Sequence, residues 1–357
     1  MTIHIDHAPF TLPLRRPVPC NGVQVVERRG ILLALRGAEG EVGYGEAAPL
    51  PGLHTESTAD VARALPEVAH ALSAARIESL GELRETLLAT AARTMPALLF
   101  GIEMAWLCRA ARRQGSGIAH LLAAAPSRTV PLCKLFDGSA DAARAVRVIP
   151  GAGSIKVKVG RRPLAEERAI LRSLTASPTA RLRLDGNRSL DLDRAAALLE
   201  GFDPARFEFF EEPLAEPTEL PALTDRTGIR IALDETLRDP DSDTLRAADC
   251  VAAWVVKPTL LGGFATTIEL AVAARSRGIT CVVSSCFESG LGLWALAHLA
   301  AAIPDSTTAG LGTDRWLAED LIEPPFSSAR GQVDLADWVP APAPETLRRL
   351  HLQEVRA

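Results

Sequence analysis

Aromatic residues are scarce in this 357-residue chain, and positive charge is not in excess. Phe, Trp and Tyr make up 4% of the sequence, and 39 Lys and Arg residues against 44 Asp and Glu give a formal net charge of −5. Proteins that bind nucleic acid usually carry a basic stripe for the phosphate backbone and aromatic rings that stack on bases. We therefore expect no nucleic-acid partner.

Paired cysteines and a long apolar run are also lacking, and we expect no signal peptide. The six cysteines form no C-x-x-C pair and lie among apolar residues, which predicts reduced core thiols in a cytoplasmic protein. The first six residues alternate like a strand and lack the basic start of a signal peptide. The longest weakly polar stretch, residues 290–304, contains His298 and is shorter than the ~20 apolar residues of a spanning helix, so we expect no membrane insertion.

Common local motifs for zinc and phosphate are absent as well. There is no H-E-x-x-H pattern and no G-x-x-x-x-G-K-[ST] loop, and Gly151-Ala152-Gly153 lacks the third glycine of a dinucleotide-binding turn. Hydrophobic residues nevertheless make up 47% of the chain, enough for a large core. The length predicts two domains, or one barrel with an appended domain.

The first third of the chain has the pattern of an α+β domain, residues 1–125. Apolar alternation and helical spacing predict two strands and three helices there, at residues 31–35, 41–46, 58–74, 80–92 and 96–113.

From about residue 130, eight short apolar runs alternate with amphipathic helical patterns. Successive run centres lie 23 to 27 residues apart, the length of one strand, one helix and two short loops. This spacing predicts a (β/α) barrel, with a doubly wound open sheet as the rival. The centres are Leu132, Val157, Leu184, Phe209, Ala232, Val255, Val282 and Ala309.

Charged residues stand at the ends of five consecutive runs, and this position favours the barrel, because a parallel barrel collects its chemistry at the carboxyl ends of its strands. The runs end in Lys156-Val157-Lys158, Asp185-Gly186-Asn187, Glu211-Glu212-Pro213, Asp234-Glu235 and Lys257-Pro258-Thr259.

Three of these residues, Asp185, Glu211 and Asp234, are carboxylates separated by 26 and 23 residues. Ends of neighbouring strands lie ~5 Å apart, so the three charges would repel unless a divalent cation neutralised them. An all-oxygen site suits Mg²⁺, with Mn²⁺ as a substitute. The alternative is that each carboxylate caps a helix or forms a structural ion pair.

Three others are lysines. Lys156 and Lys158 are two apart on one strand and point to the same face, whereas Lys257 lies on the other side of the carboxylates. Beside a cation and other lysines, the pKa of an ammonium falls and the amine can serve as a general base. The alternative is that the lysines only balance the carboxylates.

Lysine bases and a metal together suit removal of a proton next to a carboxylate. Such a proton is weakly acidic, so the reaction needs a base on one face and a cation that stabilises the enediolate. Enolase-type sites combine a Lys or His base with magnesium in this way.

The ordered set of strand ends resembles the muconate-lactonising branch of the enolase superfamily. The resemblance implies a modified (β/α)₇β TIM-type barrel with an N-terminal α+β capping domain: residues 1–125 as the cap, 126–325 as the barrel and 326–357 returning to the cap. Stretches at 43–52, 182–188, 256–262 and 283–292 resemble the o-succinylbenzoate synthase family, which dehydrates a small carboxylate substrate in menaquinone biosynthesis.

The resemblance also assigns roles. It implies that Asp185, Glu211 and Asp234 bind Mg²⁺, that Lys158 removes the proton and then helps the hydroxyl leave as water, and that Lys257 steadies the enediolate. It leaves a supporting role for Glu212. Implied substrate-binding positions are Lys156, Arg183, Asn187, Ser284 and Gly310.

Simpler readings remain open for two substrate positions. Ser284 could cap the following helix, and Arg183 could pair with Asp185. Residues 15–29 and 49–57, the latter with His54 at its centre, match two capping-domain loops that close over the barrel mouth, although their composition suits any surface loop.

Related activities remain as alternatives. No His follows Lys257 until His298, which argues against enzymes whose second base is a histidine, and residues 310–314 lack the Asp-x-Asp of dipeptide epimerases. Two opposed lysines could still serve an N-acylamino-acid racemase or a dipeptide epimerase, and a non-catalytic homologue is a further alternative. The sequence does not indicate an oligomeric state.

Overall fold

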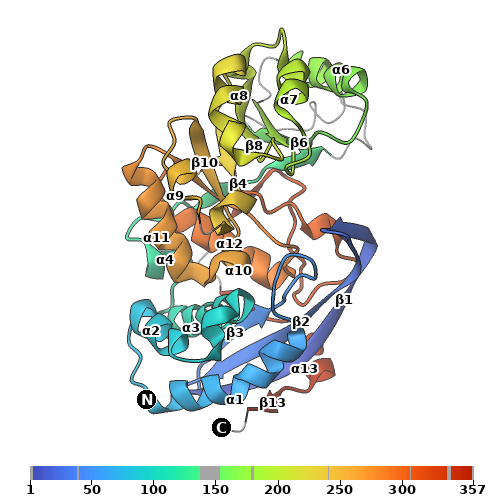
Figure 1. Cartoon of the computed structure of the whole chain (residues 1–357). Coiled ribbons are helices and arrows are strands. Elements are labelled where there is room, and N and C mark those ends of the chain that lie inside the picture. The colour runs from blue at the N-terminus through green and yellow to red at the C-terminus, as the bar shows by residue number, and fades with distance from the viewer. Residues whose placement is uncertain are drawn as a thin grey trace.

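The computed structural model describes residues 3–37, 40–136, 153–177, 181–239, 241–305, 307–335 and 339–355. The N-terminal elements form an antiparallel sheet with helices packed on it, and the rest of the chain forms a strongly curved parallel sheet surrounded by helices (Figure 1). The first and last described segments lie side by side, with Asp6 paired to Glu354, at the end of the N-terminal part that faces away from the parallel sheet.

The N-terminal sheet has the strand order β13-β1-β2-β3. Strand β1 (His4–Cys20) and β2 (Val23–Arg36) form a long hairpin whose turn, Asn21-Gly22, has φ values of 42° and 81°, as a two-residue hairpin turn requires. The expectation of a capping loop at residues 15–29 is therefore wrong for most of that stretch. Paired strands occupy it up to Cys20 and again from Val23, with a register shift between Pro13 and Val18.

Strand β3 (Val42–Ala47) packs tightly against helix α3 (Pro96–Gln114). A Cβ added at Gly45 would lie 2.0 Å from the carbonyl oxygen of Gly101, and one at Gly43 would lie 2.0 Å from that of Ala105. Glycine is therefore required where the sheet meets this helix. The other helices of this part are α1 (Thr58–Ala74), α2 (Leu80–Leu88), the 3₁₀ turn η1 (Ala91–Thr94) and α4 (Ile118–Leu122).

All three helices predicted in the first third are present, with one difference. Helix α1 begins after a capping box formed by Ser57 and Asp60 and has the predicted bounds. The predicted helix at 80–92 ends at Leu88, because Thr90 starts the separate 3₁₀ turn by accepting a hydrogen bond from the amide of Ala92.

The parallel sheet closes into a barrel. Its strand order is β11-β10-β9-β8-β7-β6-β5, and single parallel bridges from Ser284 to Gly310 and from Leu132 to Ala309 join the two edges through a very short eighth strand. The predicted capped (β/α) barrel is confirmed, and all eight predicted run centres lie on or beside these strands. The strands are β5 (Lys134–Phe136), β6 (Ser154–Lys158), β7 (Arg181–Asp185), β8 (Phe207–Glu211), β9 (Ile231–Leu233), β10 (Val251–Val256) and β11 (Thr280–Val283).

Helices cover the outside of the barrel (Figure 1). They are α6 (Leu164–Thr175), α7 (Leu192–Leu199), α8 (Leu220–Thr227), α9 (Asp243–Arg246), α10 (Pro258–Leu261), α11 (Gly263–Ser276) and α12 (Gly290–Ala302), with 3₁₀ turns η2 (Pro204–Arg206), η3 (Pro217–Glu219), η4 (Glu235–Arg238) and η5 (Asp314–Trp316). A two-stranded ribbon of β4 (Thr129–Pro131) and β12 (Gln332–Asp334) lies beside the barrel. After α13 (Pro344–Leu350), β13 (Gln353–Glu354) returns to pair with β1.

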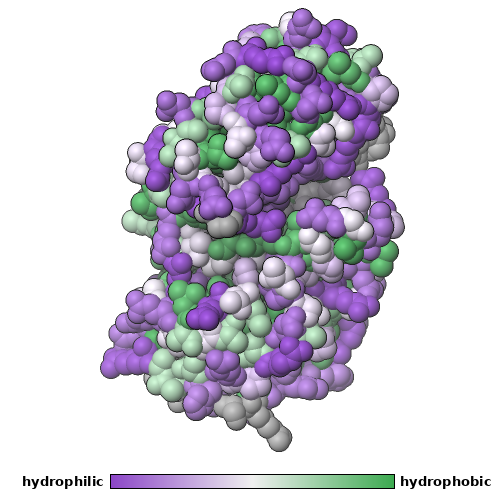
Figure 2. Space-filling view, in the orientation of Figure 1, coloured by the Kyte–Doolittle hydropathy of each residue, from purple (hydrophilic) through white to green (hydrophobic). Residues whose placement is uncertain are grey.

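Hydrophobic residues of the cap and of the barrel form one large buried cluster, and a small separate cluster fills the inside of the barrel with Phe209, Ala232, Ala253, Val255 and Val282. All six cysteines are buried and free, as predicted, whereas the cytoplasmic location stays a prediction. Hydrophilic residues predominate on the face shown in Figure 2, where hydrophobic ones form small separate groups. None of the helices in the described ranges is long and apolar enough to cross a bilayer.

Candidate active site

The barrel brings the predicted charged residues together at the carboxyl ends of its strands. In the parallel ladders, Lys158 is the register partner of Asp185, and Asp185 is the partner of Glu211. Asp234 directly follows β9 and Lys257 directly follows β10, so five neighbouring strands contribute to one cluster. Exposures of 1%, 2% and 6% for Asp185, Glu211 and Asp234 show that the three carboxylates are buried.

Each of the three carboxylates contacts a lysine. The Nζ of Lys156 lies 2.9 Å from Oδ2 of Asp185 and donates to both oxygens of Glu211, at 2.8 and 2.7 Å. Lys158 donates to Oδ2 of Asp185 at 2.8 Å and to Oδ1 of Asn187 at 2.6 Å. From the other side, Lys257 pairs with Asp234. The two predicted catalytic lysines therefore approach the carboxylates from opposite ends of the row β6 to β10.

Electrostatics in this cluster differ from the expectation for the lysines. Burial lowers the pKa of Lys156, but the negative charges of the adjoining Asp185 and Glu211 together have a larger effect in the opposite direction. The pKa of Lys156 therefore lies well above its ordinary value. Burial also lowers the pKa of Lys257, but Asp234 together with Cys286, Glu211 and Glu235 raises it well above its ordinary value. A fall in pKa was expected for lysines beside a bound cation; beside these carboxylates the pKa of the two residues moves the other way, because attraction to the surrounding carboxylates together exceeds the cost of burying the ammonium.

The carboxylates differ from one another. Burial raises the pKa of Glu211 to about 8, and the negative charges of Asp185 and Asp234 add to this although Lys156 opposes it. Burial also acts on Asp185, but the ammoniums of Lys156 and Lys158 bring its pKa far below the ordinary value. Three lysines thus face three carboxylates, and Glu211 is the carboxylate whose charge burial disfavours most.

Glu212 supports the cluster instead of pointing into it. Its Oε1 accepts hydrogen bonds from the amides of Asp234 and Thr236 at 2.8 and 2.7 Å, and its Oε2 accepts from Nε of Arg188 at 2.9 Å. Glu212 and Arg188 have positive φ values of 37° and 54°, a strained conformation that the surrounding contacts must maintain. The carboxylate of Glu212 therefore fixes the backbone that carries Asp234.

Arg183, one of the predicted substrate residues, is engaged with the protein in a way that sequence reasoning did not anticipate. Arg183 is buried and pairs with Glu208 at 2.5 Å, donates to the carbonyl of Thr308 at 2.6 Å and stacks on Phe209. The alternative prediction that Arg183 pairs with Asp185 is therefore wrong, because its partner is Glu208. None of these contacts supports a role of Arg183 in substrate binding. The register of β7 and β8 shifts between Leu182 and Arg183, which leaves Glu208 as an extra residue on β8. Strict alternation of side chains along the strands therefore does not predict that Arg183 and Glu208 meet.

Ser284 and Gly310 meet where the barrel closes. Ser284 Oγ donates to the carbonyl of Gly310 at 3.3 Å, and a Cβ at position 310 would lie 2.6 Å from that hydroxyl oxygen. The N-cap of the following helix is Ser289, so the reading of Ser284 as a helix cap is wrong. Glycine at position 310 leaves the space that the Ser284 side chain occupies.

The carboxylates of Asp185, Glu211 and Asp234 are the ligand type that a hard divalent cation prefers, although in this structure each of them pairs with a lysine. No three acidic, His or Cys groups in the described residues converge on one point as metal ligands. Yet the Lys156 ammonium bridges carboxylates of two strands, so the chain already holds a positive charge between them. Beside Asp234, Oε2 of Glu235 is buried without a hydrogen-bond partner. Buried carboxylate oxygens on neighbouring strands that already share one positive charge are what Mg²⁺ selects.

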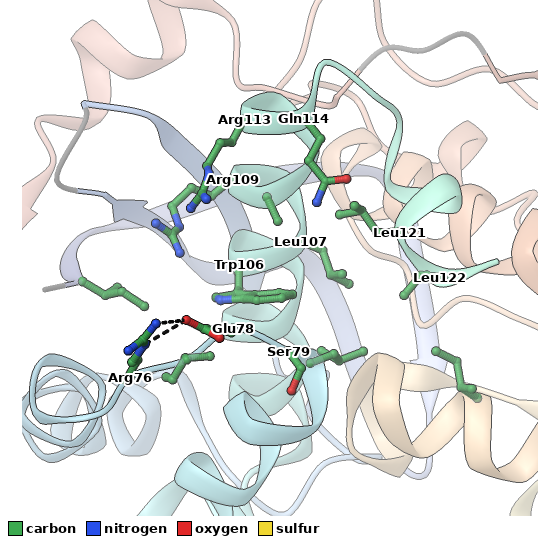
Figure 3. A pocket seen from close by; sticks show the side chains of 15 residues that line it. Arg76, Glu78, Ser79, Trp106, Leu107, Arg109, Arg113, Gln114, Leu121 and Leu122 are labelled. Atoms are coloured by element: carbon green, nitrogen blue, oxygen red, sulfur yellow. Dashed lines mark hydrogen bonds and ion pairs between the residues drawn. The ribbon is translucent and has the colours of Figure 1, made fainter. Parts of the chain in front are cut away.

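A separate cavity of about 780 Å³ lies between α2, α3 and α4 in the cap and contains none of these residues. Figure 3 shows Trp106 lying flat in it, with the Arg76–Glu78 ion pair at one side and Leu107, Leu121 and Leu122 at the other. It is distinct from the candidate active site.

Comparison with known proteins identifies the family of this chain. The sequence profile described as "Enolase C-terminal domain-like" matches residues 139–341, and the profile described as "MenC, N-terminal domain" matches residues 7–109. The chain belongs to the enolase superfamily.

Curated relatives narrow this assignment. The o-succinylbenzoate synthase of Edwardsiella ictaluri is 34% identical over 309 residues, which cover 85% of this chain and 88% of the relative. That of Yersinia pseudotuberculosis is 33% identical over 323 residues, covering 88% and 91%. Within the superfamily the chain therefore belongs to the o-succinylbenzoate synthase family, and it is an enzyme of the carbon–oxygen lyase class.

The chain also matches a much longer plant protein. "Protein PHYLLO, chloroplastic" of Arabidopsis thaliana is 29% identical over 352 residues, which cover 86% of this chain and 20% of PHYLLO. The chain thus spans about one fifth of that protein's length.

Solved structures agree on the fold. N-succinyl Arg/Lys racemase from Bacillus cereus superposes with a TM-score of 0.84 at 19% identity over all of both chains. A dipeptide epimerase from Enterococcus faecalis, complexed with Mg and a dipeptide, gives 0.83 at 20% identity over 95% of this chain and 99% of the epimerase. Muconate lactonizing enzyme from Pseudomonas fluorescens gives 0.83 at 20% identity over 98% and 99%. At these identities the likeness establishes the capped barrel alone.

Proposed function

We propose that this protein is an o-succinylbenzoate synthase, which converts 2-succinyl-6-hydroxy-2,4-cyclohexadiene-1-carboxylate to 2-succinylbenzoate and water in menaquinone biosynthesis. The observation that carries the proposal is the row of three buried carboxylates at neighbouring strand ends, with Lys158 at one end and Lys257 at the other. Relatives named o-succinylbenzoate synthase that align over most of both chains support the choice within the superfamily.

In the proposed reaction Lys158 is first a base and then an acid. Its neutral amine takes the proton from the ring carbon next to the carboxylate, and the C–H electrons pass into the carboxylate as an enediolate. The resulting ammonium then gives that proton to the departing hydroxyl, the C–O bond breaks, and water leaves as the ring becomes aromatic. The contacts of Lys158 with Asp185 and Asn187 fix where its Nζ stands.

Lys257 is the proposed electrostatic partner. It pairs with Asp234 at the end of the carboxylate row opposite Lys158, so its ammonium would offer positive charge to the enediolate on the side away from the base. Lys156 and Asn187 are proposed to help position the substrate, and Ser284 with Gly310 to contact its succinyl arm. Arg183 has no part in this proposal.

A divalent metal, Mg²⁺ with Mn²⁺ as substitute, is the proposed cofactor, and Asp185, Glu211 and Asp234 are its proposed ligands. When bound, it would stabilise the negative charge that develops on the carboxylate oxygens of the substrate. Glu212 would keep Asp234 in place as a ligand, because it holds the Asp234 amide.

The test is mass spectrometry of the purified protein incubated with 2-succinyl-6-hydroxy-2,4-cyclohexadiene-1-carboxylate, with Mg²⁺ and with a chelator in parallel. We expect a product lighter by one water in the Mg²⁺ sample only. Unchanged substrate in a folded, Mg²⁺-loaded sample would contradict the proposal.

Racemisation of an N-acylamino acid is the second candidate, because two lysines at opposite ends of the carboxylate row could serve two faces of a substrate. This activity predicts exchange of the α-proton of both enantiomers in D₂O, which NMR detects. Absence of exchange at both enantiomers would eliminate it.

A further inference from the structure

The loop that follows β3, residues 48–54, lies where the cap meets the barrel. Figure 1 shows it rising from the cap sheet toward α10. Side chains of both parts hold its carbonyl groups: Asn21 donates to Gly52 at 2.9 Å, and Arg238, the last residue of η4 in the barrel, donates to Leu53 at 3.0 Å. A sequence of Pro, Gly and polar residues suits a mobile loop, but these contacts fix it.

His54 joins this loop to the segment that carries Lys257. The amide of Leu50 donates to Nδ1 of His54 at 2.9 Å, so Nε2 carries the hydrogen, and Nε2 donates to the carbonyl of Thr259 at 2.8 Å. Thr259 lies two residues after Lys257 and begins α10 with Pro258. Both ring nitrogens are therefore used, one inside the cap loop and one across to the barrel.

The connection continues to the loop after Ser284. The hydroxyl of Thr259 donates to Oε1 of Glu288 at 2.8 Å, and Oε2 of Glu288 accepts from the amide of Cys286 at 2.7 Å. Buried Arg28 of β2 donates to the carbonyl of Phe287 at 2.9 Å and also to Ala48 in the cap loop. The cap loop, the turn after Lys257 and the loop after Ser284 thus form one hydrogen-bonded unit.

We propose that His54 is a positioning residue, which fixes the turn after Lys257 against the cap and so holds the Lys257 ammonium where the proposed dehydration needs it. The proposal rests on the proposed function for its kinetic consequence. The hydrogen bond from the His54 ring to the Thr259 carbonyl is seen in the structure and does not depend on the proposed function.

Three substitutions separate the two hydrogen bonds of the ring. His54→Gln can keep the donor to Thr259, His54→Asn is too short for Thr259 but keeps an acceptor for the Leu50 amide, and His54→Leu removes both. Because a displacement of about 1 Å at a reacting group can cost on the order of 100-fold, we expect kcat to fall ~10- to 100-fold in the Asn and Leu variants. We expect KM to stay within about twofold and the Gln variant to recover most of kcat.

The kinetic measurement is kcat and KM for all four proteins at saturating Mg²⁺, with unfolding midpoints as a control for folding. Loss of kcat in the Asn and Leu variants with recovery in the Gln variant supports the proposal. Full kcat in the Asn or the Leu variant would overturn it, and so would equal loss in all three.

Hydrogen exchange on the proteins without substrate keeps the test independent of the proposed function. The amides of Leu260 and Leu261, which donate to the Lys257 carbonyl at 2.9 and 3.1 Å, report on the turn. We expect faster exchange there in the Asn and Leu variants than in wild type and the Gln variant. If wild type fails to convert the substrate, the proposed function is wrong, and this comparison alone decides whether His54 fixes the turn. Equal exchange in all four proteins would overturn the proposal.

Discussion

A buried carboxylate in contact with a lysine is the unit from which the site is built. The sequence predicted which residues would meet, because strand ends of a parallel barrel must share one rim. It did not predict the direction of the lysine pKa shifts, which depends on whether an ammonium faces carboxylates or other cations. Contacts at 2.7–2.9 Å from Lys156 to Asp185 and Glu211 set the direction of its pKa shift, and the spacing of residues in the sequence does not reveal these contacts.

Glu212 gives the first prediction at the residue scale. The Glu212→Gln variant loses the ion pair with Arg188 and loosens the backbone of Asp234, so we expect Mg²⁺ affinity to fall ~10- to 100-fold. Calorimetry measures this directly. The exposed Glu216, in the same stretch of chain, provides the control variant Glu216→Gln, which should bind Mg²⁺ as wild type does. Equal affinity for both variants would show that Glu212 has no effect on the metal site.

His54 gives a pH-dependent prediction. Burial lowers its pKa from 6.5 to about 4, with Arg28 and Arg238 also opposing protonation against the two backbone hydrogen bonds. The unfolded chain therefore binds a proton that the folded chain does not between about pH 4 and 6.5. In this window the free energy of unfolding falls as the pH falls, by at most ~1.4 kcal/mol per pH unit from this group.

Denaturant unfolding of wild type and His54→Gln at several pH values checks this. The difference in stability between the two proteins should decrease on going from pH 7 to pH 4. A difference that is constant across this range would mean that His54 is not held neutral.

At the element scale, glycine sets the distance between β3 and α3. The Gly45→Ala methyl group would collide with the backbone of Gly101, so we expect a loss of ~1–3 kcal/mol in the free energy of unfolding. Gly81 in α2 is the matched control, because a Cβ there has only Ser79 Oγ near it, at 3.9 Å. Gly81→Ala should be neutral or stabilise by up to ~1 kcal/mol. Similar urea midpoints for the two variants would contradict this account of the packing.

Elements were more predictable than the contacts between them. The helices and barrel strands follow from local periodicity, and the start of α1 coincides with its capping box. The hairpin at residues 15–29 was missed because Pro and Arg interrupt the apolar alternation there and the register shifts between Pro13 and Val18. Arg183 with Glu208 and His54 with Thr259 were missed for a different reason, since each contact joins side chains or backbone from different strands or domains.

At the scale of the whole molecule, lysine is rare: it occurs only at positions 134, 156, 158 and 257. Selective isotope labelling of lysine therefore gives an NMR spectrum with few signals, three of them from the cluster. We expect added Mg²⁺ to shift the signals of Lys156, Lys158 and Lys257, because their carboxylate partners are the proposed ligands. Lys134 is the internal reference, since its register partner on β6 is Ile155 rather than Lys156 and its side chain points away from the barrel interior.

Asp234→Asn is the control for this titration. It should weaken or abolish the Mg²⁺-dependent shifts without changing the fold. Shifts that are absent in wild type, or that persist unchanged in the variant, would mean that the carboxylates are structural.

The central claim is that the strand-end cluster carries out a metal-dependent dehydration with Lys158 as the base. Its most direct test compares wild type and Lys158→Ala in the same mass-spectrometric assay with 2-succinyl-6-hydroxy-2,4-cyclohexadiene-1-carboxylate and Mg²⁺. We predict formation of 2-succinylbenzoate by wild type and a rate at least ~10³-fold lower for the variant, with both proteins folded by circular dichroism. A Lys158→Ala protein that forms product at the wild-type rate would contradict the account.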